Sequence, residues 1–490
     1  MLAIYQALVW ILRPIFFLFE TFTEKGKKYA FDISNTFSAL ETFKNSLSPE
    51  QKLIWFHSAS VGEMDQANAI IHAFRNSSKK TQARYVFLQT YFSTSVSEKQ
   101  KKMSQADLVL RMPLDIPRNY DPFFAIPNLS AIVFVAWDVW PNLVLRAKKN
   151  SIKTFLVCAS GTGGLKNPFY IPILRKLDGV FTIDETGVHN FQKRGLEEFR
   201  PRLVSCGDSR FDSVMEKIEL GKAPEEFLEW KKFLAKGNSG KGNSKMAKVG
   251  KSKNSNRVLF ASTYSICEEY LLQFFQISLE REGLTKFLAH KSSFWVFPHK
   301  LETNRMELFK KRLDELQVSC FLFSEVLKIL KATPSKNETL KSSRSKHFHG
   351  PNSEHKSLES IFQKTHVILF DQMGILAFAY ELAGFVYVGG ALEHRVHNTI
   401  EPAYFGNSIF TGPKISASLE ALEFQKRGFL KTVATKEEFG KVLEDYFENS
   451  DAFLQKRKTI SQFVQSMRGA SDRIRKALET EIAVQNSKSN

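Results

Sequence analysis

An isolated carboxylate stands where a short apolar run gives way to a helical pattern. The stretch from Leu53 to Ala69 reads LIWFHSASVGEMDQANA, so Glu63 follows Gly62 in the first turn of the expected helix. Open α/β folds bind ligands beyond the ends of their strands, where a glycine allows close approach. A carboxylate there could take a proton from an acceptor hydroxyl. An acid at a helix N-terminus also complements the helix dipole without any function, so placement alone leaves both interpretations open.

A second group of small and polar residues lies late in the chain. The stretch YVGGALEHRVHNTIEPAYFGNSIFTGP places Gly389-Gly390 after an apolar run and puts Asn398 and Glu401 at the start of a helical pattern. Free N–H groups at a helix start bind anions such as a nucleotide phosphate, and an asparagine there either caps the helix or binds ligand. A glycine pair alone is weak evidence. The whole order GG…HNxxEP…GP is much more specific.

Short apolar runs alternate with helical patterns through both halves of the chain, which is typical of βαβ units around a parallel sheet. At 490 residues the chain is long enough for two cores. We therefore predict two Rossmann-like α/β domains facing a central cleft, followed by helices from Thr435 to Ala483. The expected strands are 53–57, 84–90, 108–113, 130–136, 153–159, 179–184 and 202–207 in the first half, and 256–262, 293–298, 318–324, 367–371, 384–390 and 407–412 in the second.

The net charge of +18 is concentrated in two Gly/Ser/Asn/Lys-rich segments, Lys231 to Asn256 and Lys331 to Leu358, which together carry 12 of these charges. Little apolar periodicity occurs in either segment, so both are expected to be flexible surface insertions. Few aromatic residues are interleaved to stack bases, which argues against a nucleic-acid partner. Attraction to an anionic membrane surface is the favoured residual role.

The four cysteines lie far apart in the sequence, without a CxxC pair or a His cluster at ligand spacing. This arrangement disfavours a structural zinc site and suits a reducing compartment. We expect no metal ion.

The N-terminal segment MLAIYQALVWILRPIFFLFE is apolar except for Gln6, Arg13 and Pro14. No small-residue cleavage site follows it, so a removed signal peptide is not expected. Its length is at the lower limit for crossing a bilayer, and lysines follow at 25, 27 and 28. We interpret it as a membrane anchor, either spanning or interfacial, in preference to a buried first helix.

These patterns suggest a division of the chain into successive parts. The expected parts are a membrane anchor at 1–24, an N-terminal domain at 25–215, a linker with a basic insertion at 216–256, a C-terminal domain at 257–440 interrupted by the insertion at 331–358, and C-terminal helices and tail at 441–490.

Several segments, taken together, resemble one enzyme family. The segments are HSASVGE, MPLDIP and WDVWPNL in the first half, and ASTYSICEE, DQMGIL and GGALEHRVHNTIEP in the second. They are similar to motifs of the 3-deoxy-D-manno-oct-2-ulosonic acid (Kdo) transferases, membrane-anchored glycosyltransferases that move Kdo from CMP-Kdo onto the lipid A precursor. The resemblance runs over most of the chain.

The resemblance implies a GT-B architecture and an inverting displacement without a metal ion or other cofactor. It implies that the acceptor binds the N-terminal domain and CMP-Kdo the C-terminal one, at the cytoplasmic face of a bacterial inner membrane with its lipids as a partner. Glu63 falls on the family's catalytic base and Asp138 on its second motif acid, while Ser60 and Gly62 fall on the acceptor side. The donor-binding positions implied are Ser262, Thr263, Met373, Gly374, Gly389, Gly390, Asn398 and Glu401.

The chain departs from the family pattern at several places. Ala136 and Ser160 replace a motif glutamate and an arginine, Ile375 replaces another glutamate, and the donor-binding segment reads PHKLET. A serine cannot replace a guanidinium on phosphate, so His299, Lys300 and Arg395 are candidates to supply the missing charge. Two alternatives stay open: a GT-B envelope glycosyltransferase with another nucleotide sugar, and a degenerate membrane-bound scaffold. The sequence predicts no oligomeric state.

Overall fold

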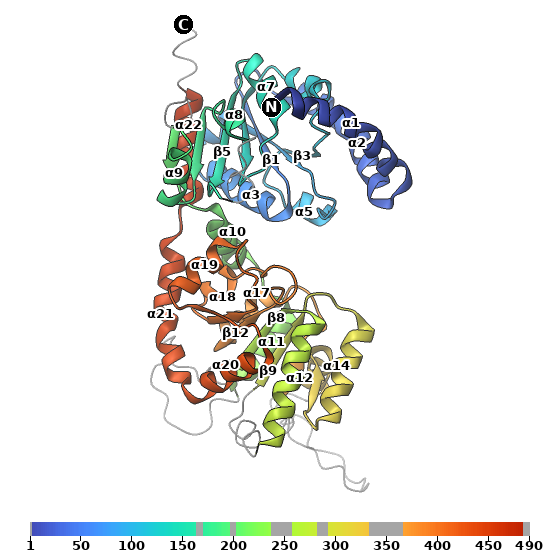
Figure 1. Cartoon of the computed structure of the whole chain (residues 1–490), viewed down its shortest axis with the longest axis vertical. Coiled ribbons are helices and arrows are strands. Elements are labelled where there is room, and N and C mark those ends of the chain that lie inside the picture. The colour runs from blue at the N-terminus through green and yellow to red at the C-terminus, as the bar shows by residue number, and fades with distance from the viewer. Residues whose placement is uncertain are drawn as a thin grey trace, which may run out of the picture. The chain divides into compact units, whose positions relative to one another are not determined.

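The computed structural model describes residues 2–162, 170–196, 202–236, 257–281, 293–332 and 366–483. The chain forms two compact α/β units (Figure 1). Unit 1 contains Met1–Glu216 and Met467–Asn490, and unit 2 contains Lys217–Ser466. The expected pair of parallel-sheet α/β domains is therefore confirmed.

Unit 1 is built on a seven-stranded sheet of order β3-β2-β1-β4-β5-β6-β7, in which every pair is parallel. Six of the seven residues of the central strand β1 are buried, because helices cover both faces of the sheet. This burial explains why the strands appear in the sequence as continuous apolar runs. The strands are β1 Lys52–Ser58, β2 Tyr85–Tyr91, β3 Leu108–Arg111, β4 Leu129–Val135, β5 Lys153–Ala159, β6 Gly179–Thr182 and β7 Arg202–Ser205.

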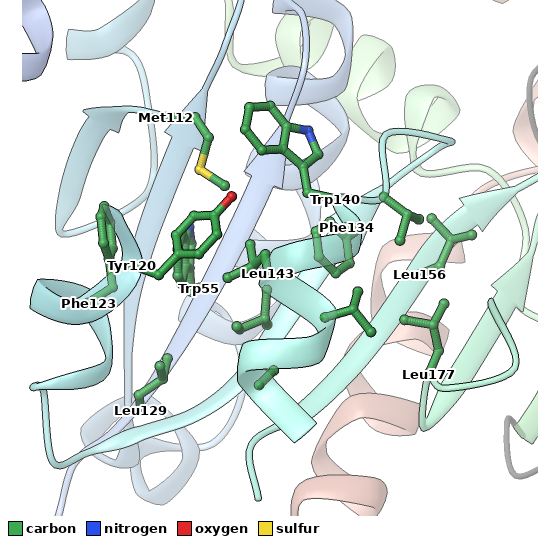
Figure 2. Packing of buried hydrophobic residues seen from close by; sticks show 14 of the residues in the cluster. Trp55, Met112, Tyr120, Phe123, Leu129, Phe134, Trp140, Leu143, Leu156 and Leu177 are labelled. Atoms are coloured by element: carbon green, nitrogen blue, oxygen red, sulfur yellow. The ribbon is translucent and has the colours of Figure 1, made fainter. Parts of the chain in front are cut away.

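Two apolar clusters, one on each face of this sheet, make the core of unit 1. On one face, Trp55 stacks on Phe123 with ring centroids 4.5 Å apart, and Leu143 of α7 packs into the same cluster (Figure 2). On the other face lie apolar residues of α3 and α22. The helices of unit 1 are α1 Leu2–Phe22, α2 Glu24–Ser46, α3 Val61–Arg75, α4 Lys79–Arg84, α5 Glu98–Lys102, α6 Asp121–Phe124, α7 Pro141–Lys149, α8 Ile171–Leu174, α9 Glu185–Gln192 and α22 Ala470–Ala483, while α10 Ser209–Leu220 runs across the boundary into unit 2.

The last helix belongs to unit 1 although it follows the whole of unit 2 in sequence. Figure 1 shows α22, at the red end of the colour bar, within unit 1. Asp212 on α10 accepts hydrogen bonds from the backbone N–H groups of Gly469 and Ser471, at 2.7 and 2.6 Å. Ile474 and Leu478 then pack into the core beneath α3.

Unit 2 repeats the plan with a sheet of order β10-β11-β9-β8-β12-β13-β14, again with parallel pairs. Its strands are β8 Arg257–Thr263, β9 Ser293–Pro298, β10 Cys320–Leu322, β11 Val367–Leu369, β12 Phe385–Val388, β13 Ser408–Thr411 and β14 Leu430–Thr432. Its helices are α11 Glu225–Lys236, α12 Ser265–Glu280, α14 Thr303–Glu315, α15 Phe323–Ala332, α17 Leu376–Ala379, α18 Ile400–Tyr404, α19 Leu419–Lys426, α20 Lys436–Glu448 and α21 Ser450–Ser466.

The structure differs from the sequence expectations at three segments. Helix α11 continues to Lys236, because the buried side chains of Phe227 and Trp230 stabilise it. The prediction that a flexible segment begins at Lys231 is therefore wrong. Strand β10 ends at Leu322, since Phe323 and the residues after it continue as α15. Strand β14 was not expected, because only one residue of this short edge strand is buried. The rest of the two basic insertions, 237–256 and 333–358, lies outside the described residues.

Candidate active site

In unit 1, Glu63 lies in the first turn of α3, directly after β1. Its Oε2 atom accepts hydrogen bonds from the backbone N–H of Ala59 at 2.5 Å and of Ser60 at 3.0 Å. Glu63 therefore caps the N-terminus of α3, as expected if the residue has a structural role. The side chain is 7% exposed, and no described residue hydrogen-bonds its Oε1 atom.

A buried histidine connects the ends of β1, β2 and β4. The Nε2 atom of His57 lies 3.1 Å from Oδ2 of Asp138, and its Nδ1 atom lies 2.9 Å from Oγ1 of Thr90. The indole N–H of Trp140 donates to the same Oδ2 of Asp138 at 2.9 Å. The Asp138 carboxylate is thus held at the carboxyl end of β4, beside the strand that precedes Glu63.

The two carboxyl groups have pKa values that move in opposite directions. Burial raises the pKa of Glu63, and the charge of Asp138 adds to the rise, which outweighs the backbone hydrogen bonds and His57. Burial alone would raise the pKa of Asp138 as well, but its hydrogen bond and charge interaction with His57 lower the pKa overall. When the pKa values of two neighbouring acids differ in this way, one acid can act as the proton acceptor while the other supplies a fixed negative charge.

The backbone around this edge leaves space at one position and is strained at another. A Cβ atom on Gly62 would have no heavy atom within 4 Å, so packing gives no reason for a glycine there. Ala136, which follows β4, has a positive φ of 62°. Non-glycine residues with such angles concentrate at functional sites. The predicted acceptor-side residues Ser60 and Gly62 therefore lie on the same turn as Glu63, with open space beside Gly62.

In unit 2, the turns after β8 and β12 pack directly against each other. Ser262 has a positive φ of 52° at a register shift in β8. A Cβ atom on Gly389 would lie 2.1 Å from the carbonyl oxygen of Ser262, so only glycine fits there. Gly390 has a φ of 96°, which also favours glycine. Three predicted donor-site residues are therefore adjacent in space.

Thr263 is buried and takes part in an ionic network. Its hydroxyl donates to Oε1 of Glu268 at 2.9 Å, while Arg305 donates to the same carboxylate at 2.7 Å and to the carbonyl of Thr263 at 2.9 Å. These bonds use the side chain of Thr263 within the protein. Its contribution to the site is thus to hold the turn after β8.

Four aromatic and imidazole rings gather beside this turn. Tyr264 lies 4.9 Å from His299, 5.7 Å from His397 and 5.4 Å from His394, as measured between ring centroids. The Tyr264 hydroxyl is 3.1 Å from Nε2 of His397. We call these four residues the imidazole cluster.

Burial and neighbouring positive charge lower the pKa values of two histidines in the imidazole cluster, His299 and His397. Burial lowers the pKa of His397 to about 4, and His299, Arg395 and His394 contribute to the shift. Burial also lowers the pKa of His299, with Lys300 and Arg305 acting in the same direction. A bound anion would relieve this repulsion, so the cluster is suited to anion binding.

The remaining predicted donor-site residues lie on loops of unit 2 or, for Glu401, in the first turn of α18. Asn398 caps α18, because its Oδ1 accepts from the backbone N–H of Ile400 at 2.9 Å, and its Nδ2 donates to Glu401 at 3.1 Å. Met373 is 71% exposed, and Gly374 beside it has a φ of 87° and open space around its Cβ position. Lys300 and Arg395 are exposed, and their charges act on His299 and His397, respectively.

Sequence reasoning missed several residues that complete these two sites. His57 and Trp140 support Asp138, and Tyr264, His394 and His397 form most of the imidazole cluster. His57 could have been found, because it lies near the end of β1 and begins the HSASVGE segment. Among the described residues, no group of three or more His, Cys, Asp or Glu side chains is arranged to hold a metal ion.

Comparison with known proteins shows which family this chain resembles. Residues 34–213 match the family described as 3-Deoxy-D-manno-octulosonic-acid transferase (kdotransferase). The 3-deoxy-D-manno-octulosonic acid transferase of Aquifex aeolicus is 23% identical over 80% of this chain and 86% of its own length. A bifunctional glycosyltransferase/methyltransferase of Fusobacterium nucleatum is 20% identical over 82% of this chain, which spans only 54% of that protein.

Among solved structures, a glycosyltransferase from Rickettsia africae superposes with a TM-score of 0.50 at 12% identity, covering 89% of this chain and 99% of the other. This likeness concerns the fold alone, which is that of the GT-B glycosyltransferases. The family model and the relatives aligned over most of the sequence show that the chain is similar to the Kdo transferases.

Proposed function

We propose that this protein transfers Kdo from CMP-Kdo to a hydroxyl group of the lipid A precursor, with Glu63 as the general base. The observation that carries the proposal is the buried Glu63, whose raised pKa suits proton abstraction near neutral pH, next to the His57–Asp138 pair. The match of residues 34–213 to the Kdo transferase family supports the reaction class. The names of the relatives support Kdo as the transferred sugar.

In the proposed reaction, the acceptor oxygen attacks the anomeric carbon of Kdo while the bond from that carbon to the CMP phosphate oxygen breaks. The acceptor proton passes to Glu63, and CMP leaves with the bonding electrons. Positive charge develops on the sugar ring and negative charge on the phosphate. The Asp138 carboxylate would stabilise the positive charge on the sugar ring. The imidazole cluster, together with Arg395 and Lys300, would stabilise the negative charge on the phosphate.

Donor binding is proposed for unit 2, at the turns after β8 and β12. Gly389 and Gly390 allow the two turns to pack closely there, and His299, His394 and His397 can share the charge of a phosphate. These imidazoles would bind the phosphate in place of the arginines found in the family motif. The reaction would take place at the cytoplasmic face of a bacterial inner membrane.

The proposal is tested by mass spectrometry of the lipid product. Full-length protein in membrane vesicles, given CMP-Kdo and a tetra-acylated lipid A precursor, should produce a Kdo-bearing lipid, and Glu63→Gln should not. Glu185→Gln is the matched control, because Glu185 is an exposed acid in the first turn of α9, after β6 of the same sheet. Absence of product from the wild-type protein would contradict the proposal.

Titrations with CMP, UDP and GDP separate the alternatives. The proposal expects CMP to bind most tightly. Tighter binding of UDP or GDP would instead indicate a glycosyltransferase with another donor, which the replacement of a motif glutamate by the fully buried Ile375 favours. Normal membrane association with no nucleotide binding would indicate a scaffold.

A further inference from the structure

Helix α1 is attached to unit 1 at both of its ends. At its first turn, the Tyr5 hydroxyl donates to Oδ2 of Asp115 at 2.6 Å, and Gln6 donates to Oδ1 of Asn142 at 3.1 Å. At its other end, the ring of Phe16 contacts that of Tyr29 on α2 at 5.1 Å. The Tyr29 hydroxyl donates to the carbonyl of Met112 at 3.1 Å, which fastens α2 to the same unit.

The contact of Tyr5 with unit 1 involves a buried and fully hydrogen-bonded carboxylate. Asp115 is 6% exposed, and it also accepts hydrogen bonds from the Tyr120 hydroxyl at 2.6 Å and from the backbone N–H of Asn142 at 3.0 Å. A buried carboxylate with these partners fixes Tyr5 at the edge of unit 1. Because a bilayer is about 30 Å thick, the start of α1 cannot lie on the opposite side of a membrane while this contact holds.

The side of α1 that faces away from unit 1 carries a continuous apolar stripe. Ile11, Ile15, Leu18 and Phe22 follow the spacing i, i+4, i+7, i+11, and each is between 53% and 76% exposed. The half-buried Tyr5, Val9 and Phe16 lie on the opposite side of the helix. The apolar window Tyr5–Phe22 is long enough to cross a membrane by length and composition, yet none of it is buried within the protein.

The charges of α1 and of the turn after it oppose a spanning arrangement. Arg13 stands at the middle of the apolar window, where a crossing helix would place its guanidinium at the bilayer centre. Arg13 is two positions from both Ile11 and Ile15, so it lies nearly opposite the stripe, with its guanidinium 5.5 Å from the Trp10 ring. The start of α2 carries Glu24 and exposed lysines, which also disfavours insertion of the α1–α2 turn.

We infer that α1 lies flat on the membrane, with its apolar stripe in the lipid and its first turn on unit 1, and does not cross the bilayer. The occupant of the stripe is an anionic bilayer surface. Its acyl boundary fits Ile11, Ile15, Leu18 and Phe22, and its headgroups fit the exposed Lys25, Lys27 and Lys28. The start of the chain described here then stays on the same side of the membrane as both catalytic carboxylates.

The orientation can be tested without any transferase activity, so its failure and that of the proposed function are distinguishable. The four native cysteines are buried, which allows Ala3→Cys to be labelled by a membrane-impermeant maleimide. We expect no labelling in intact spheroplasts, but labelling in inverted vesicles or after detergent lysis. Labelling in intact spheroplasts would overturn the inference, because it places the start of α1 across the membrane.

A second measurement tests the occupant. The paired substitution Ile15→Asp and Leu18→Asp should weaken binding to vesicles containing phosphatidylglycerol at least tenfold, whereas Leu308→Asp, at an exposed apolar position on α14, should not. If the paired variant keeps full vesicle binding, the inference is wrong. It is also wrong if the pair instead converts a wild-type dimer into a monomer in sedimentation velocity, since the stripe would then cover a second copy.

Discussion

The two units share one architecture but present opposite chemistry at the carboxyl ends of their strands. In unit 1 this edge carries the Glu63 and Asp138 carboxyl groups, which are linked through His57. In unit 2 it carries the imidazole cluster with Arg395 and Lys300 beside it. Each edge also includes a non-glycine residue at positive φ, Ala136 or Ser262. The fold supplies similar turns twice, and the side chains alone make one edge suited to proton transfer and the other suited to anion binding.

The largest expected effect comes from removing the carboxylate of unit 1. Glu63→Gln should lower the transfer rate at least ~100-fold, because the amide cannot accept the acceptor proton. Its thermal stability at neutral pH should be equal to the wild type or higher. A raised folded pKa stabilises the fold only below the unfolded pKa, and this contribution is lost as the pH rises through the folded pKa. Product analysis and thermal melts measure both effects, and an unchanged rate would break the division between the units.

The next effect concerns the backbone of unit 2. Gly389→Ala should destabilise the protein by roughly 1–3 kcal/mol, because the added Cβ would lie 2.1 Å from the Ser262 carbonyl oxygen. Gly62→Ala, in unit 1, is the matched comparison, since its Cβ meets open space. Chemical denaturation of both variants measures the contrast. Equal stability of the two would show that the turns after β8 and β12 are not packed as described.

Asp138→Asn should have a smaller effect on the rate, about tenfold, through loss of a fixed negative charge. Because the charge of Asp138 raises the pKa of Glu63, this variant should also move the acidic limb of the pH–rate profile to lower pH. Asp121→Asn, in an exposed ion pair with Arg146, serves as the control. A lower rate with an unmoved acidic limb would separate Asp138 from the ionisation of Glu63.

The smallest expected effect is a pH dependence of anion binding at unit 2. CMP-Kdo should bind a few-fold more tightly at pH 5.5 than at pH 7.5, because a bound phosphate raises the low pKa of His397, which burial sets at about 4. Calorimetry with cytidine, which lacks phosphate, should give no such gain. His397→Phe should reduce the dependence, and an unaltered dependence would remove His397 from the proposed site.

The same depressed pKa has a consequence for stability. The folded pKa of His397 lies below its unfolded value of about 6.5. Its contribution to the unfolding free energy is therefore present above the unfolded pKa and is lost as the pH falls through the folded one. Denaturation of wild type and His397→Phe between pH 7 and pH 4 should show this loss only in the wild type.

Much of the fold could be read from the order of apolar runs, because strands covered on both faces are necessarily continuous in hydrophobicity. The turn that carries Glu63 could be located for the same reason. The partnership of His57 with Asp138 could not, since 81 positions separate the two residues and no local pattern links them. The end of α11 was predicted too early, because the lysine-rich composition after Trp230 indicated a flexible segment. The helical spacing of Phe227 and Trp230 was the local signal for a helix there.

By itself, the sequence determined the two parallel-sheet halves, the turns after their strands and the glutamate on the first of them, because these depend on short-range periodicity. Only the tertiary structure decided which distant groups meet. It gathered Tyr264, His299 and His397 from three loops, and it joined Tyr5 to Asp115 across 110 positions. Burial and neighbouring charge then set the protonation of these groups, and both depend on the packing of the whole unit.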